Sequence, residues 1–184
     1  LCLEVKKRRL NIYVLFFNAG IQYTGAKRPR RSKQGIELTF AVNHLSHFYL
    51  THKILPFIDT SNNPRIIITS SEVHNPKSGG GKVGAKASLG NLNGLESGAG
   101  FEMIDGYEFN ADKAYKDSKL CNILFAKKLS NYLIARNLSI PVIAWAPGLV
   151  ISRDSQGFFR HSRKYNPLGQ ILFAFLARDI PVSY

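Results

Sequence analysis

The sequence contains few cysteines and no long apolar run. Cys2 and Cys121 are the only cysteines in 184 residues, which excludes a disulfide framework and gives no metal-ligand spacing. No apolar run reaches the roughly 18 residues that a membrane span needs. Charged residues 6–9 stand where a secretory signal would need its apolar region. We therefore expect no bound metal, no transmembrane segment, and a soluble protein in a reducing compartment.

Acidic residues are also scarce, with 12 Asp and Glu against 25 Lys and Arg, a net charge of +13. The basic residues cluster at 6–9, 27–33 and 160–164. Such patches bind nucleic acid, anionic membrane surfaces or phosphorylated cofactors, although a solvated basic surface is the simplest interpretation. No nucleic-acid motif interleaves aromatics with these charges, so we expect no nucleic-acid partner. A peripheral membrane contact through the basic surface and an oligomer stay open.

Three short apolar runs alternate with segments whose apolar residues recur at helical spacing. Residues 10–17, 65–71 and 141–146 are typical of buried parallel strands. Helical periods cover about 35–58 and 111–136, and two further helical pieces are expected around 158–163 and 168–177. This rhythm predicts one α/β domain with a doubly wound, Rossmann-type parallel sheet and flanking helices.

The segment from about 72 to 110 has no strong period and holds nine glycines. Such length is unusual for a connection inside a compact domain and is typical of lids or binding loops. A flexible insertion without function is the equal alternative.

Polar or turn-forming residues stand at the carboxyl end of each expected strand. They are Asn18, Ser71 and the pair Pro147 and Gly148. In open parallel sheets, ligands bind outside the carboxyl ends of the strands. The sequence therefore predicts a binding site at this edge.

Tyr115 and Lys119 are four residues apart in an expected helix, so both lie on one helix face. An ammonium group near a phenol favours the phenolate, and we expect it to lower the pKa of Tyr115, making it a general acid near neutral pH. The spacing alone is weak, because Tyr23 with Lys27 and Tyr49 with Lys53 repeat it.

Taken together and in order, several short motifs resemble the short-chain dehydrogenase/reductase family over nearly the whole chain. They are Asn18-Ala19-Gly20, Val42-Asn43-His44, the strand ending in Ser70-Ser71, Tyr115-x-x-x-Lys119 preceded by Ser118, and the segment from Pro147 to Ser152. Residues 86–95, 103–109 and 114–122 are similar to the light-dependent protochlorophyllide reductase branch. That branch also carries a long insertion and a cysteine at the position of Cys121, but usually has Ala where Gly20 stands.

The resemblance implies a role for each site residue. Tyr115 would donate a proton, Lys119 would bind the nicotinamide ribose, and Ser71 would hold the substrate oxygen. Asn43 would anchor a relay water, or would instead be a buried asparagine bonded to backbone. The cysteine of that branch implies a substrate contact for Cys121.

The resemblance also implies NADPH as cofactor and hydride donor. Asn18, Ala19 and Gly20 would line the cofactor cleft, while Pro147 and Gly148 would shape the nicotinamide pocket. Ser152 would contact the carboxamide. For the protochlorophyllide branch, the substrate is a pigment whose ring C=C is reduced in light, in chlorophyll biosynthesis and photosynthesis. The compartment would then be a plastid, and otherwise the cytoplasm.

A member of this family should begin with a strand and a Gly-rich turn that binds the pyrophosphate. No such turn precedes residue 10, so we interpret residues 1–184 as one partial dinucleotide-binding and catalytic domain, incomplete at both ends. A carbonyl- or retinol-type dehydrogenase is the second hypothesis. A non-catalytic relative that lacks a cofactor site is the third.

Overall fold

The computed structural model describes residues 1–8, 10–148 and 160–176. Three strands, β1 (Val14–Phe17), β2 (Arg65–Thr69) and β3 (Val142–Trp145), form a parallel sheet in the order β1-β2-β3. The predicted α/β class with a parallel sheet is thereby confirmed. The first strand is shorter than the apolar run 10–17, since Ile12 makes only an isolated bridge with Ile58.

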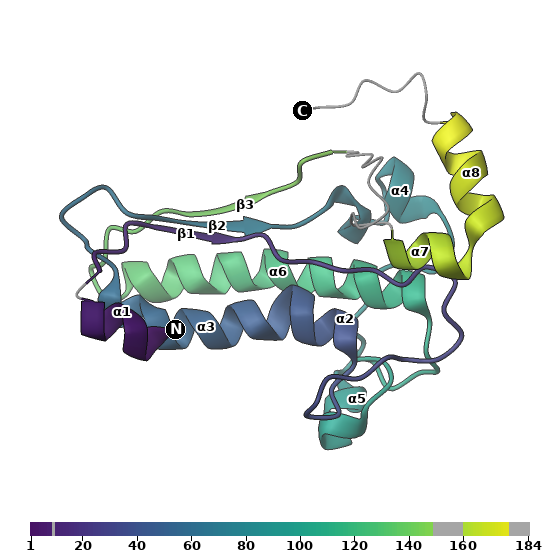
Figure 1. Ribbon diagram of the computed structural model, residues 1–184, viewed down its shortest axis with the longest axis horizontal. Helices are drawn as coiled ribbons and strands as arrows, with labels where there is room; N and C mark the ends of the chain where they lie inside the picture. The colour runs from purple at the N-terminus through teal and green to yellow at the C-terminus, as the bar shows by residue number, and fades with distance from the viewer. Residues whose placement is uncertain (9, 149–159, 177–184) are drawn as a thin grey trace.

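Two helical connections join the strands. The first consists of α2 (Leu38–Phe40), the π-helical turn η1 (Ala41–Leu45), α3 (Ser46–Ile54) and the 3-10 turn η2 (Leu55–Phe57). The second contains α6 (Ala111–Ile134). Both α3 and α6 lie on the same face of the sheet (Figure 1). Sequential strand order with crossovers of one hand produces this arrangement, because each step across the sheet places its helix on the same side.

The main core lies between that face and the two helices. The strands contribute Phe17, Ile66 and Ile68, and α6 contributes Phe125, Leu129 and Leu133. The other face of the sheet carries Phe16 and Trp145, which are 52% and 40% exposed with ring centroids 6.1 Å apart. Within the described residues, helices therefore cover one apolar face and leave much of the other open (Figure 1).

The glycine-rich insertion is folded onto α6. It contains η3 (Glu72–His74), α4 (Gly79–Lys82), α5 (Asn93–Glu96) and η4 (Gly98–Gly100). Phe101 and Ile104 pack with Cys121 of α6 in a second apolar cluster. Lys113 of α6 bridges Asp105 and Asp117 at 2.7 and 2.6 Å. These contacts hold the 101–105 part of the insertion against α6.

Three helices lie outside this framework. No helix was expected at α1 (Cys2–Arg8), whereas α7 (Arg160–Tyr165) and α8 (Pro167–Leu176) fall near the two expected helical pieces. The ring of Tyr23 lies 4.5 Å from that of His161, which brings α7 against the loop after β1. No helix in the described ranges has the length and apolar character needed to cross a bilayer.

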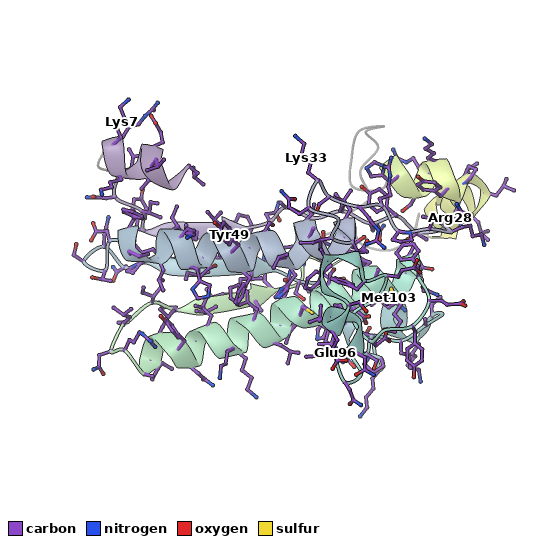
Figure 2. All side chains as sticks on the ribbon, turned by 90° about the horizontal axis from the view of Figure 1, so that it is seen from below. Lys7, Arg28, Lys33, Tyr49, Glu96 and Met103 are labelled. Atoms are coloured by element: carbon purple, nitrogen blue, oxygen red, sulfur yellow. The ribbon has the colours of Figure 1, made fainter. Side chains whose placement is uncertain are left out.

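The basic cluster of α1 lies apart from the other two basic clusters. Figure 2 shows Lys7 at the α1 end and Arg28 beside the C-terminal helices, at opposite ends of the long axis. The basic charge of the N-terminal helix is therefore separated from that of the loop 27–33.

Candidate active site

One face of α6 carries most of the polar groups of the site. The helix begins after Asn110, whose side chain accepts a hydrogen bond from the Lys113 N–H. Helical spacing then aligns four side chains on one face, at Tyr115, Ser118, Lys119 and Asn122. Ser118, Lys119 and Asn122 are all at most 3% exposed. A polar stripe is thus buried where the helix passes the carboxyl ends of the strands.

Ser71 lies just beyond β2, and its side chain is hydrogen-bonded with that of Tyr115. The Lys119 Nζ is 5.5 Å from the centroid of the Tyr115 ring and donates to the Thr69 carbonyl at 3.1 Å. The structure therefore brings Ser71, Tyr115 and Lys119 together from the strand end and one helix.

The pKa values correct one prediction. Burial raises the pKa of Tyr115 to about 12, against the opposing effect of its hydrogen bond with Ser71. Burial also lowers the pKa of Lys119 to about 8. The expected lowering of the phenol pKa by Lys119 is wrong for this structure, because desolvation is the larger effect and the ammonium binds a carbonyl.

The two other Tyr-x-x-x-Lys pairs have different surroundings. Tyr49 is 62% exposed, with the Lys53 Nζ 5.4 Å from its ring centroid. Tyr23 is buried in a loop, and the guanidinium of Arg30 lies over its ring. Tyr115 differs from both, because it lies on α6 beside the end of β2 and next to the buried ammonium of Lys119.

Asn43 lies in the π-helical turn η1 and is fully buried. Its Oδ1 accepts from the Ile21 N–H at 2.8 Å, and its Nδ2 donates to the Ile21 carbonyl at 2.9 Å and to Ser118 Oγ at 3.0 Å. These contacts are those of the backbone-bonding alternative, and the relay water stays a prediction. Such π turns are frequent at functional sites.

Sequence reasoning missed the residues that join these parts. The carbonyl of Thr69 accepts from Lys119 and from Asn122 Nδ2 at 3.2 Å, and Thr69 Oγ1 donates to Asn18 Oδ1 at 2.9 Å. Asn122 also donates to the Asn43 carbonyl at 3.0 Å. The helical spacing from Ser118 to Asn122 was a usable signal, but nothing local marked Thr69.

His47 is a second buried group that the sequence did not single out for the site. It stacks on Phe17 with ring centroids 5.1 Å apart, and its Nδ1 is buried without a hydrogen-bond partner in the described structure. Burial, with a smaller contribution from Lys119, lowers the pKa of His47 to about 4. The imidazole is therefore neutral at physiological pH.

The predicted cofactor residues follow β1 and β3. Asn18 and Ala19 are exposed, and a Cβ added at Gly20 would lie 3.6 Å from both Lys119 Nζ and Asn43 Oδ1. Gly148 is exposed with a φ of +78°, a conformation that favours glycine. A strip of small residues thus borders the lysine. Ser152, the remaining predicted contact, lies outside the described residues.

Cys121 faces away from this strip, into the apolar cluster with Phe101 and Ile104. Its thiol is free and buried, and burial raises its pKa to about 12. A substrate contact for Cys121 stays a prediction. In the part of the chain that is described, no group of three or more His, Cys, Asp or Glu side chains is arranged to hold a metal.

The chain is similar to one protein family and to several individual proteins. A family described as short chain dehydrogenase matches residues 1–87. Protochlorophyllide reductase B, chloroplastic, of Oryza sativa subsp. japonica is 33% identical over 187 residues, covering 98% of this chain and 45% of the relative. Protochlorophyllide reductase, chloroplastic, of Daucus carota is 43% identical over 177 residues, covering 93% and 43%. The chain spans less than half the length of these relatives.

Solved structures share the fold. A short-chain dehydrogenase/reductase of unknown function from Caenorhabditis elegans, with cofactor, superposes with a TM-score of 0.58 at 19% identity, covering 94% of this chain and 51% of the other. An uncharacterised protein from Mycobacterium paratuberculosis gives a TM-score of 0.57 at 22% identity, covering 100% and 57%.

Proposed function

Because the chain belongs to the short-chain dehydrogenase/reductase family, we propose that it carries the proton-donating site of an NADPH-dependent reductase. The observation that carries the proposal is the grouping of Tyr115, Ser71 and Lys119 at the carboxyl edge of the sheet. Tyr115 is the proton donor, and Ser71 binds the substrate atom on which charge develops.

The ionisation states suit reduction. With a pKa of about 12, Tyr115 stays protonated at neutral pH and is an acid rather than a base. Lys119, with a pKa of about 8, is mainly charged at pH 7 and stabilises the phenolate that proton transfer leaves behind. Bound NADPH would supply the hydride.

The residues present fit the nicotinamide end of that cofactor. The strip of Asn18, Ala19 and Gly20 has no large side chain next to the ammonium of Lys119, which can donate to ribose hydroxyls. Pro147 and Gly148 border the same edge from β3. NADPH is preferred over NADH on the resemblance, since nothing in the described residues distinguishes the two cofactors.

The proposed substrate is protochlorophyllide, reduced at a ring C=C in light, and the proposed compartment is the plastid. Support comes from the relatives, which are named as chloroplastic protochlorophyllide reductases. The hydrogen bond between Ser71 and Tyr115 also favours a second candidate, a carbonyl- or retinol-type dehydrogenase, because two hydroxyl groups can bind one carbonyl oxygen.

The test uses the longest polypeptide encoded in frame with this sequence. NADPH and protochlorophyllide are mixed in darkness, and product absorbance is followed after illumination. We expect light-dependent turnover, reduced by 10²- to 10⁴-fold in Tyr115→Phe. Turnover of a carbonyl substrate in darkness would favour the second candidate. Failure to bind NADPH in calorimetry would favour a non-catalytic relative.

A further inference from the structure

Lys116, the residue after Tyr115, is a buried lysine bound by backbone carbonyls. It is 6% exposed, and its Nζ donates to the carbonyls of Gly81, Val83 and Ala85. Gly84, between two of these carbonyls, has a φ of +63°. This left-handed turn suits glycine and curls the chain around the ammonium. Lys116 therefore fixes one end of the insertion to the helix of the site.

The segment 71–85, called here the Ser71 arm, connects Lys116 with Ser71. Near its start, His74 Nδ1 lies 2.5 Å from the Ser71 carbonyl. Further along, Ser78 Oγ donates to the carbonyls of Glu72 and Asn75 at 2.8 and 2.9 Å, and accepts from the Gly81 N–H at 3.0 Å. Continuous internal bonds therefore link the two ends of the arm.

The backbone of the arm approaches itself closely at Gly81, the one residue of the arm that is buried. A Cβ added at Gly81 would come within 1.8 Å of the Asn75 carbonyl oxygen, so the backbone approaches there more closely than any side chain permits. Hydrogen bonds within the arm and the contact at Gly81 give a displacement at one end a path to the other. The same bonds connect the carbonyls around Lys116 with the backbone of Ser71.

We propose that Lys116 is a positioning residue that holds the Ser71 hydroxyl against Tyr115 through the Ser71 arm. Tyr115 and Lys116 are neighbours on α6, and Ser71 and the carbonyls around Lys116 are the two ends of the arm. The hydrogen bond between Ser71 and Tyr115 is therefore anchored on α6 from both sides. The catalytic role of that bond rests on the proposed function, but the anchoring does not.

Lys113 provides a matched control on the same helix. Its Nζ binds the Ser88 carbonyl at 2.7 Å and the carboxylates of Asp105 and Asp117, which all lie outside the Ser71 arm. Lys113→Met removes a partly buried cation, whose side chain is 14% exposed, and loosens a different part of the insertion. It leaves the bonds from Lys116 to Ser71 in place.

The experiment follows the tyrosine Cζ resonances of the protein labelled with ¹³C at that carbon, at pH 7 and without substrate. Tyr115→Phe assigns the signal, and Ser71→Ala defines the Tyr115 shift when the Ser71 bond is absent. We expect Lys116→Met to move the Tyr115 signal at least halfway to the Ser71→Ala position. Lys113→Met should leave it in place, and Tyr132, at the far end of α6, should not respond to any of these variants.

Ser78→Ala keeps the result decisive if Lys116→Met does not fold, because it cuts the middle of the arm without unpairing a buried charge. It should move the Tyr115 signal in the same direction. If Lys116→Met folds and its Tyr115 resonance stays at the wild-type position, the proposal is overturned. If Lys116→Met does not fold, a Tyr115 resonance at the wild-type position in Ser78→Ala overturns it.

Turnover then separates this proposal from the proposed function. In an active reductase, Lys116→Met should lower kcat about tenfold with little change in the KM for NADPH, while Lys113→Met keeps kcat within about threefold. If no substrate is turned over, the proposed function fails and the resonance shifts still decide the role of Lys116. A rise in the KM for NADPH with unchanged kcat would contradict the positioning role.

Discussion

Both halves of α6 bury side chains, but the first half buries mainly polar and charged ones and the second half buries apolar ones. The first half presents Lys116, Asp117, Ser118, Lys119 and Asn122 to the interior, and the second half presents Phe125, Ala126, Leu129 and Leu133. The apolar half lies under the middle of the sheet, while the polar half passes the strand ends. Burial of the first half destabilises the fold, because charged and polar groups lose water there. Burial of the second half stabilises the fold, because apolar side chains leave water. A site and a core thus share one helix.

The largest expected effect tests the apolar half. Leu133 is 1% exposed and packs in the main core, so Leu133→Ala should lower the free energy of unfolding by about 2–5 kcal/mol. Urea denaturation followed by circular dichroism measures the change. Its neighbour Ile134 is 68% exposed, and Ile134→Ala should stay within about 0.5 kcal/mol. Equal losses in both variants would mean that the second half of α6 does not form the core.

A change of opposite sign is expected in the polar half. The lowered pKa of Lys119 corresponds to a cost of about 3 kcal/mol for holding its ammonium in the fold. Lys119→Met should therefore raise the free energy of unfolding at pH 7 by about 1–3 kcal/mol, while turnover is lost. Lys127→Met, at an exposed position of the same helix, is the control.

The pH dependence of this difference gives a second measurement. The folded state releases the Lys119 proton near pH 8, whereas the unfolded chain keeps it until about 10.5. Wild-type stability therefore gains a contribution as the pH rises from 8 to 10.5, and the advantage of Lys119→Met shrinks over that range. Denaturation midpoints at pH 7 and pH 9.5 test this. A variant less stable than wild type at pH 7 would show that the ammonium stabilises the fold.

The smallest effect concerns the border of the polar half. Ala at Gly20 would meet Lys119 and Asn43 only at ordinary contact distance, so Gly20→Ala should change the free energy of unfolding by less than about 0.5 kcal/mol. Gly25 has a φ of +88° and would place its Cβ 3.2 Å from the Tyr165 carbonyl oxygen. Gly25→Ala should cost about 1–2 kcal/mol by thermal denaturation. A larger loss at Gly20 than at Gly25 would contradict the described geometry.

The sequence predicted those features that repeat at short range. Strand runs, the long helix and the alternation of the two follow from periodicity, and they are present as β1, β2, β3 and α6. The spacing from Tyr115 to Lys119 placed both on one helix face. The π-helical turn around Asn43 was not predicted, because its pattern of apolar residues resembles that of an ordinary helix. The charge-rich α1 was missed because its sequence lacked a clear apolar period.

The sequence by itself determined the α/β class, the order of the elements and the types of residue at the strand ends, since these depend on local periodicity and turn chemistry. Only the tertiary structure decided which groups lose their water and which partners they find. Burial, not the neighbouring ammonium, sets the pKa of Tyr115, and Thr69 accepts hydrogen bonds from residues 50 and 53 positions away. The insertion is fixed because Lys113 and Lys116 find its carbonyls across the fold. Desolvation and distant hydrogen bonds depend on the packed chain, so no short stretch of sequence specifies them.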